Sequence, residues 1–358
     1  MKILWLNHRD PLNPRAGGAE RTMHEISKRL VALGNEVTIY SPKWIGSKEK
    51  DVLDGVKIIR KGNNLSTHVI LPFFLLKNKF DVVINDLAHG IPWISSVFLE
   101  KKNVVFFRHL HARSLPGQVN IILAKIITAL EKMYPFIYRN STIVTESSTS
   151  ETDLIYLGFK IENIQRIPPG IDLDLFHPGE KTKNVQLLYF GGLRKYKRPE
   201  YVIKVYEELC DEIKELKVIV IGDGPLLTKM KEYVKNRKYN IDFLGKIEYN
   251  ELSKRIRESW INLHFSVTEG WGLSIMESSA SGTPSVSFEV PGVVDIIKND
   301  YNGFLVNDIS EFKEKILYII DKEDFFINNS RKFAEGFTWD NTSKMWCQLL
   351  NKTKSSQK

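Results

Sequence analysis

Short apolar runs alternate with helix-period segments along almost the whole chain, and this alternation starts again after Pro178-Gly179. Apolar runs separated by helices are typical of parallel strands, because the crossover helices cover both faces of such a sheet. The sequence therefore predicts an α/β protein with two doubly wound, Rossmann-like domains of similar size. The expected strands are 2–6, 36–40, 57–60, 81–84, 103–107 and 142–145 in the first domain, and 186–190, 217–221, 241–244, 261–265, 284–288 and 303–306 in the second.

The expected boundary between these domains follows Pro178, where segment 178–184 is rich in Gly, Lys, Thr and Asn and has the composition of a linker. We therefore assign residues 1–178 to the first domain and 179–337 to the second. In 338–358, apolar residues recur at helical spacing, which predicts a closing helix that crosses back to the first domain. Open parallel sheets bind ligands beyond the carboxyl ends of their strands, so the two domains are expected to face each other across a cleft.

The cysteine count, the length of the apolar runs and the net charge indicate which classes of protein and of ligand this chain fits. Two of the 358 residues are cysteines, Cys210 and Cys347, so neither a disulfide framework nor a zinc motif is available and we expect a reducing, cytoplasmic location. No apolar run approaches the length of about 18 residues that crossing a bilayer needs, and segment 1–8 is too short for a signal peptide. The net charge is +8 with scattered cations and no nucleic-acid motif, so we expect phosphate-bearing ligands or a membrane surface rather than nucleic acid.

Segment 268–277 carries two glutamates, Glu269 and Glu277, on either side of the loop Gly270-Trp271-Gly272. If a helix begins at Leu273, the glycines leave bare N–H groups at its N-terminus, where partial positive charge favours a phosphate. The steps between the two carboxylates span roughly 12 Å at helical rise, enough for one to reach a sugar and the other a ribose. The pattern predicts a sugar-nucleotide site; the alternative is an ordinary turn with two solvated carboxylates.

Two further loops follow strands expected in the first domain. Gly17-Gly18 lies between the first strand and the first helix, where the backbone can approach phosphate or sugar oxygens closely; the alternative is a flexible turn. His109 follows strand 103–107 and is either a hydrogen-bond donor to a sugar hydroxyl or a structural histidine. The pair of His109 and His111 lacks the supporting carboxylates of a metal site, and we expect no metal.

A third loop, 191–199, follows strand 186–190 in the second domain and contains Arg194 and Lys197 among several closely spaced cations. Cations at a strand end, beside glycines and before a helix, can neutralise a diphosphate and stabilise it as a leaving group. A solvated basic loop is the alternative interpretation.

In number and order, these motifs resemble those of GT-B glycosyltransferases in the retaining group called glycosyltransferase family 4. The resemblance covers nearly the whole chain. It implies that residues 179–337 bind a nucleotide sugar and that residues 1–178 form the acceptor-side domain. It rests on segments 17–21, 167–172, 176–178, 222–225, 243–245, 269–277, 280–284, 291–295 and 302–306.

The resemblance also implies a role for each matching residue. Glu269 and His109 would act at the donor sugar, and Glu277 would bind the ribose. The groups that would hold the donor phosphates are Gly17, Gly18, Lys197 and the backbone of the segment Gly270, Trp271, Gly272 and Leu273. The family's arginine, five residues before the lysine, is replaced by Gly192, so Arg194 is the candidate for the missing charge.

The implied reaction transfers a hexose from a UDP- or GDP-linked sugar to a hydroxyl of a glycan, with retention of the anomeric configuration and without a metal or cofactor. The leaving phosphate would help to deprotonate the acceptor on the same face of the sugar. A sugar-nucleotide epimerase of the same fold and a non-catalytic nucleotide-sugar-binding protein are the alternatives. A nicotinamide-dependent oxidoreductase is disfavoured because no Gly-x-Gly-x-x-Gly fingerprint occurs.

Two apolar segments of the first domain bear on where the acceptor binds. Segment 119–130 is mostly apolar with Lys125 and Lys132 nearby, which fits either a helix resting on a membrane surface or a core helix of the first domain. Segment 73–77 fits the same two alternatives, a membrane-surface helix or a core helix. If the helix binds lipid, the enzyme would be peripheral on the cytoplasmic membrane face and its acceptor a lipid-linked glycan.

Overall fold

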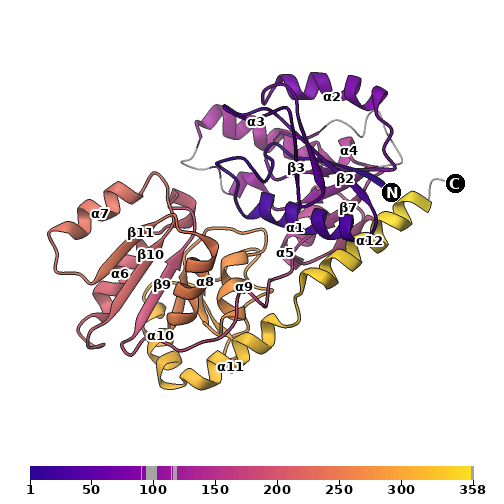
Figure 1. Ribbon diagram of the computed structural model, residues 1–358. Coiled ribbons are helices and arrows are strands. Elements are labelled where there is room, and N and C mark those ends of the chain that lie inside the picture. The colour runs from indigo at the N-terminus through magenta and orange to yellow at the C-terminus, as the bar shows by residue number, and fades with distance from the viewer. Residues whose placement is uncertain (90, 94–102, 114, 116–118, 356–358) are drawn as a thin grey trace. The chain divides into compact units, whose positions relative to one another are not determined.

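The computed structural model describes residues 1–89, 91–93, 103–113, 115 and 119–355, and the chain divides into two compact units (Figure 1). The first unit comprises residues 1–112, 119–170 and 339–358, and the second comprises 113–118 and 171–338. Each unit is built around a sheet of mainly parallel strands with helices packed against it. This arrangement confirms the prediction of two doubly wound α/β domains.

The first sheet has the strand order β3-β4-β2-β1-β5-β6-β7-β8. Neighbouring strands are parallel except for β3 and β4, which form an antiparallel hairpin at the edge. The sequence did not predict β3 or β8, because a charged edge strand and a strand of 3 residues carry little apolar pattern. The strands are β1 (Lys2–Leu6), β2 (Glu36–Ser41), β3 (Lys50–Leu53), β4 (Val56–Arg60), β5 (Val82–Asp86), β6 (Asn103–Phe107), β7 (Thr142–Thr145) and β8 (Ile164–Arg166).

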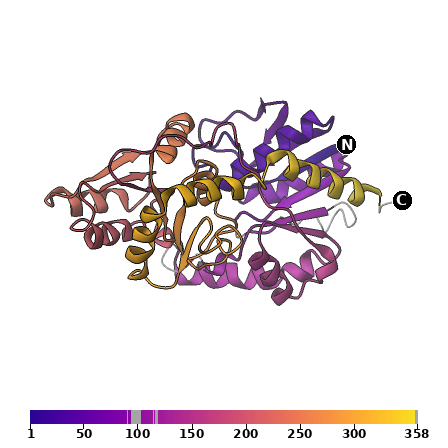
Figure 2. The same ribbon diagram turned by 90° about the horizontal axis from the view of Figure 1, so that it is seen from below.

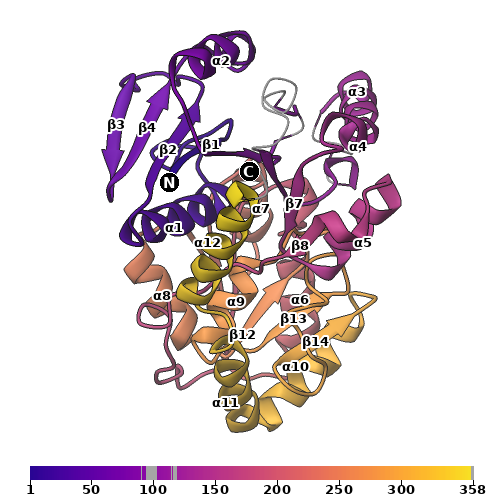
Figure 3. The ribbon, with the colours of Figure 1, turned by 90° about the vertical axis from the view of Figure 1, so that its right-hand side faces the viewer.

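Two helices, α1 (Gly18–Ala32) and α12 (Trp339–Ser355), lie side by side on one face of this sheet (Figure 3). Trp346 of α12 is fully buried, and its ring lies 5.3 Å from that of Trp5 on β1. The closing helix predicted for 338–358 therefore packs on the first unit, beside elements near the N-terminus (Figure 2). Among the described residues, the other helices of this unit are α2 (Ser66–Lys77), α3 (Ile121–Lys132), α4 (Tyr134–Ile137), α5 (Ser148–Leu157) and the 3-10 turn η3 (Ile161–Asn163), and the 3-10 turn η2 (His111–Arg113) lies where the chain passes between the units.

Helix α3 exposes its apolar side chains instead of burying them. Ile121, Ile122 and Ile126 are 71%, 69% and 51% exposed, and the buried residue of the helix is Glu131. The core-helix alternative for segment 119–130 is therefore wrong. Helix α2 likewise exposes Phe73, and Figures 1 and 3 both show α2 and α3 at the same end of the first unit.

The boundary between the units lies between Gly170 and Ile171, earlier than the predicted position after residue 178. The Ile171 N–H donates to the Phe337 carbonyl at 2.9 Å, and Phe176 is fully buried in the core of the second unit. The Lys181 ammonium donates to a backbone carbonyl of the second unit at 2.7 Å, and burial lowers the pKa of Lys181 to about 7. Segment 178–184 is thus anchored to the second unit, because its polar groups make hydrogen bonds to distant residues that its linker-like composition does not reveal.

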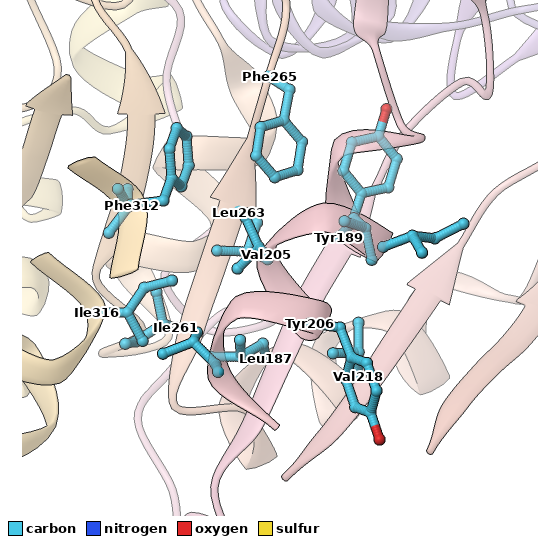
Figure 4. Packing of buried hydrophobic residues seen from close by; sticks show 14 of the residues in the cluster. Leu187, Tyr189, Val205, Tyr206, Val218, Ile261, Leu263, Phe265, Phe312 and Ile316 are labelled. Carbon is cyan, nitrogen blue, oxygen red and sulfur yellow. The ribbon is translucent and has the colours of Figure 1, made fainter. Parts of the chain in front are cut away.

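The second sheet has the order β11-β10-β9-β12-β13-β14, and all of its neighbouring strands are parallel. Its core places strand residues such as Leu187 and Leu263 against Val205 of α6 and Phe312 of α10 (Figure 4). The strands are β9 (Gln186–Phe190), β10 (Lys217–Ile221), β11 (Ile241–Gly245), β12 (Ile261–His264), β13 (Ser285–Phe288) and β14 (Gly303–Val306). The helices are η4 (Lys195–Lys197), α6 (Tyr201–Leu209), α7 (Leu227–Lys235), α8 (Tyr249–Glu258), α9 (Leu273–Ala280), α10 (Glu311–Asp321) and α11 (Glu323–Ala334).

Candidate functional site

Two loops of the second unit leave the same edge of its sheet, because they follow the neighbouring parallel strands β9 and β12. The first loop leads to η4, which ends at Lys197. The second loop begins after His264, the last residue of β12, and contains Ser266 and Glu269. The side chains of these four residues meet in one cluster, which we call the carboxylate centre.

The Glu269 carboxylate lies in the middle of this centre. Its Oε1 atom accepts from the Lys197 ammonium, from the Ser266 hydroxyl at 2.7 Å and from His264 Nε2 at 2.9 Å. The Glu269 side chain is 13% exposed and that of Lys197 is 20% exposed. Burial by itself raises the pKa of Glu269, but Lys197 and His264 outweigh it and hold this pKa far below its usual range. Glu269 is therefore an ionised carboxylate at neutral pH.

The backbone fixes the position of this carboxylate. The Glu269 N–H donates to the Pro291 carbonyl at 3.0 Å, and the Val267 N–H donates to the Tyr196 carbonyl of η4 at 2.9 Å. Gly292 has a φ of +83°, and a Cβ there would lie 2.3 Å from the Glu269 carbonyl oxygen. Only glycine allows so close an approach, so the Pro291-Gly292 turn holds the Glu269 loop in place.

Helix α9 begins directly after this loop, at Leu273 as the sequence predicts. Gly272 is its N-cap with a φ of +99°, and a Cβ there would lie 2.9 Å from Ile296 Cδ1, so this position requires glycine. The first N–H groups of a helix have no intrahelical acceptor and carry partial positive charge, which suits a phosphate. Glu277 is buried on the same helix with 4% exposure, so the alternative of a solvated glutamate is wrong for this residue.

The short loop Gly270-Trp271 joins the carboxylate centre to α9. Trp271 is buried in the core of the second unit, and its ring lies 5.6 Å from that of Phe337. Gly270 is half-buried. Because the indole faces the core, the part of this loop that remains for a ligand is its backbone, as the family resemblance implies.

Arg194 is the candidate for the charge that is missing at Gly192. Its side chain is exposed, and its Cγ and Nε atoms each lie 3.9 Å from where a Cβ of Gly192 would stand. Burial lowers the pKa of Lys197, Glu269 raises it by more, and the charge of Arg194 opposes that rise. The Arg194 side chain thus lies beside Gly192, and its charge acts on Lys197.

His264 and Ser266 are absent from the site residues predicted from the sequence. His264 ends strand β12, and its Nδ1 atom lies 3.0 Å from the Ser287 hydroxyl on β13. A histidine at the carboxyl end of a parallel strand is the signal that indicates such a position. Ser266 offers no comparable signal, because its contact with Glu269 depends on how the loop between them turns.

In the first unit, Gly17 caps the N-terminus of α1 and Gly18 is the first residue of that helix. The Gly17 N–H donates to the buried Glu20 carboxylate at 2.7 Å. The loop before Gly17 is held by Asp10, which accepts two hydrogen bonds of 2.7 Å from the Arg60 guanidinium. Asp10 and Arg60 are both fully buried, so this ion pair anchors the start of the loop.

His109 follows β6 and is half-buried. The preceding residue, Arg108, is buried and donates to Asp86 at 2.9 Å and to the carbonyl of Ala19 at 3.2 Å. Since Ala19 belongs to the first turn of α1, Arg108 ties the end of β6 to the start of this helix. Within the first unit, His109 and the Gly17-Gly18 loop therefore lie at one edge of the sheet.

Comparison with known sequences identifies the family. The profile described as Glycosyltransferase Family 4 matches residues 16–175, and the profile described as Glycosyl transferases group 1 matches residues 171–336. The chain belongs to the family 4 type of glycosyltransferases. The two matches meet near the boundary between the units, and they confirm the family resemblance seen in the sequence motifs.

Relatives of this family 4 glycosyltransferase occur in archaea and yeast. A glycosyltransferase of Methanocaldococcus jannaschii is 28% identical over 344 residues, covering 85% of this chain and 93% of the relative. A second one from that organism is 30% identical over 222 residues, covering 58% of this chain and 55% of the relative, so the match spans about half of its length. The GPI3 subunit of phosphatidylinositol N-acetylglucosaminyltransferase from Saccharomyces cerevisiae is 19% identical over 379 aligned positions, covering 95% of this chain and 79% of the subunit.

Solved structures place this glycosyltransferase in the GT-B fold. Sucrose-phosphate synthase from Thermosynechococcus elongatus superposes with a TM-score of 0.84 at 17% identity, covering 99% of each chain. HepE of Anabaena, solved in complex with UDP and glucose, gives a TM-score of 0.75 at 16% identity, covering 98% of this chain and 100% of HepE. At such identities the likeness establishes the fold alone.

Proposed function

We propose that this enzyme transfers a hexose from a UDP- or GDP-linked sugar to a hydroxyl of a glycan and retains the anomeric configuration. The observation that carries the proposal is the carboxylate centre, in which the ionised Glu269 and the Lys197 ammonium lie in the loops beside the N-terminus of α9. A carboxylate suits the hydroxyls of a sugar, whereas an ammonium and a helix N-terminus suit a diphosphate. The complex of HepE with UDP and glucose supports a UDP-linked donor.

In the proposed reaction, the bond between the anomeric carbon and the diphosphate oxygen breaks while the acceptor oxygen bonds to that carbon on the same face. The acceptor proton passes to the departing phosphate. Lys197, Arg194 and the N-terminus of α9 stabilise the charge that grows on the diphosphate. Glu269 orients the sugar and Glu277 holds the ribose. Because these groups neutralise the leaving group, the scheme uses no metal ion or cofactor.

The roles of Gly17, Gly18 and His109 follow from the family resemblance. We assign the two glycines to the donor phosphates and His109 to the sugar and acceptor. Replacement of His109, in the first unit, by alanine is expected to lower the rate of sugar transfer.

The proposed function is tested by thermal unfolding of the chain in the presence of UDP-, GDP- and ADP-linked sugars. A ligand that binds the folded chain alone raises its stability by about 2.7 kcal/mol at a concentration of about 100 Kd, which gives a clear rise in Tm. We expect one base class to raise the Tm, and no rise with any donor would contradict the proposal. Incubation with the binding sugar alone then separates the alternatives, because an epimerase changes it without an acceptor.

Replacement of Arg194 by alanine is expected to weaken donor binding about fivefold, since an ionic contact at an exposed position contributes up to about 1 kcal/mol. The measurement is the Kd of the donor by calorimetry. Arg194→Lys should keep part of the affinity, because it keeps the charge. Arg237 is also an arginine of the second unit and packs on the Tyr233 ring, so Arg237→Ala is the matched control. If Arg194→Ala and Arg237→Ala bind the donor equally well, Arg194 does not replace the family's arginine.

We further propose that the acceptor is presented at a membrane surface and that the enzyme is peripheral there. The exposed face of α3 supports this, because Ile121, Ile122 and Ile126 lie close to the cations Lys125 and Lys132 on one helix. Apolar side chains flanked by lysines are typical of helices that lie in the interface of anionic lipids. Within the described ranges, no helix is both long and apolar enough to cross a bilayer. A lipid-linked glycan is the acceptor that this surface fits best.

Flotation with vesicles containing phosphatidylglycerol tests the membrane proposal. We expect the chain to float with these vesicles and a variant with both Ile122→Asp and Ile126→Asp to stay at the bottom of the gradient. Ile45 is fully exposed outside α3, so Ile45→Asp is the matched control and should float. A wild-type chain that does not float would indicate an acceptor free in solution.

A further inference from the structure

The reaction proposed above gives no role to His264, although this residue contacts the central carboxylate. His264 is 5% exposed at the end of β12. Its Nδ1 atom lies 3.0 Å from the Ser287 hydroxyl on the neighbouring strand β13, and its Nε2 atom lies 2.9 Å from Glu269 Oε1. Both ring nitrogens therefore have a hydrogen-bond partner, and these partners determine where the ring carries protons.

The Ser287 hydroxyl donates its single proton to the Phe288 carbonyl at 2.9 Å, so it accepts from His264 Nδ1. The ionised Glu269 can only accept, so His264 Nε2 also donates. An imidazole that donates from both nitrogens is the protonated, cationic form. With this assignment of protons, Glu269 lies between the His264 ring and the Lys197 ammonium, which are both cations.

One cation is enough to balance the charge of the Glu269 carboxylate. The second cation therefore decides whether Lys197 is available to bind the donor. The Glu269 carboxylate and a diphosphate compete for the single positive charge of Lys197, so a stronger contact with one weakens the contact with the other. If Lys197 were the sole partner, its move to the diphosphate would leave a carboxylate of 13% exposure unpaired, which is unfavourable. A cation that is fixed to a strand removes this conflict.

We propose that His264 is a positioning residue that remains bound to Glu269 as its counter-ion and so releases Lys197 to the diphosphate of the donor. This inference rests on the proposed function. Ser287 on β13 holds the ring, whereas Lys197 lies at the end of a short turn and can change partner. The titratable groups that interact electrostatically with the centre include Arg194 and Tyr196, which act on Lys197, and Tyr189, on which Glu269 acts. Before the donor binds, the centre has more positive than negative charge, as a diphosphate site requires.

The first test is nitrogen-15 NMR of the histidine side chains in the full-length chain at pH 7 without ligand. The His264 signals are those that disappear in His264→Gln, and they should show protons on both ring nitrogens. In Glu269→Gln the signature of the doubly protonated ring should be lost. A ring protonated on one nitrogen in the wild-type chain would overturn the inference. This measurement does not depend on any sugar nucleotide.

The second test is the affinity for inorganic pyrophosphate, measured by calorimetry. His264→Gln should bind pyrophosphate at least about tenfold more weakly, because Lys197 then remains with the carboxylate that only it can neutralise. The double variant of His264→Gln with Glu269→Gln should regain the wild-type affinity, because Lys197 no longer has a carboxylate to neutralise. A histidine that merely supports the fold would not show this recovery. His177→Gln, which removes a histidine of the second unit outside the centre, should bind like the wild-type chain.

The outcomes separate the inference from the proposed function. Wild-type affinity in His264→Gln, or equally weak binding in the single and double variants, would overturn the role of His264 and leave the donor site intact. A wild-type chain that binds no pyrophosphate and no nucleotide sugar would overturn the proposed donor site and this inference with it.

Discussion

Replacement of Glu269 by glutamine is expected to lower the turnover of sugar transfer by about a hundredfold to a thousandfold, the usual cost of removing one preorganised electrostatic group. The amide keeps the shape of the side chain but loses the charge to which Lys197 and His264 donate. The donor sugar would then lose an acceptor whose position the loop fixes. The measurement is the steady-state rate of transfer at saturating concentrations of the donor that raises the Tm.

The matched control is Glu212→Gln, since Glu212 is a glutamate of the same unit that forms an ion pair with Lys313 on the surface. This variant should turn over like the wild-type chain. Circular dichroism at the assay temperature checks that Glu269→Gln is folded. Wild-type turnover in a folded Glu269→Gln would remove this carboxylate from the reaction.

The strand–helix alternation predicted the fold because each buried parallel strand is itself an apolar run. The prediction failed where other forces decide the structure. β3 forms because its backbone pairs with β4, although its side chains are alternately exposed and half-buried. Segment 178–184 has the composition of a linker, but Lys181 donates hydrogen bonds to Ser259 and Thr283 of the second unit. In the sequence, a polar residue that is held by hydrogen bonds to distant parts of the chain cannot be distinguished from a residue of a loose loop.

The parts of the candidate site that could be predicted are those in which a short run of residues determines the local backbone conformation. The glycines around Trp271 indicated the start of α9, and the structure begins the helix at Leu273. The ion pair between Glu269 and Lys197 joins residues that lie far apart in the sequence. Family motifs indicated both residues, but neither motif showed that the side chains would contact each other.

Other parts of the site follow from tertiary structure alone. His264 acquires its two partners because β12 lies beside β13 and because the loop after β12 turns back. Arg194 lies beside Gly192 because of the conformation of the loop after β9, which its spacing in the sequence does not determine. Hydrogen bonds across strands and loop conformations leave no periodic pattern from which they could be predicted.

Replacement of Lys197 by alanine is expected to weaken donor binding by about tenfold to a hundredfold, because a hydrogen bond to a charged group contributes about 1.5–3 kcal/mol. The loss should exceed that of Arg194→Ala, since the Lys197 side chain is 20% exposed and its ammonium lies in the centre itself. Lys195 is an exposed lysine of the same short helix η4, so Lys195→Ala is the matched control.

The central claim is that the second unit binds the donor diphosphate at the carboxylate centre. Calorimetric titration of the selected nucleotide sugar into the wild-type, Lys197→Ala and Lys195→Ala chains tests it most directly. The claim predicts that the Kd rises by about tenfold or more in Lys197→Ala and stays unchanged in Lys195→Ala. The same Kd in all three folded chains would contradict it.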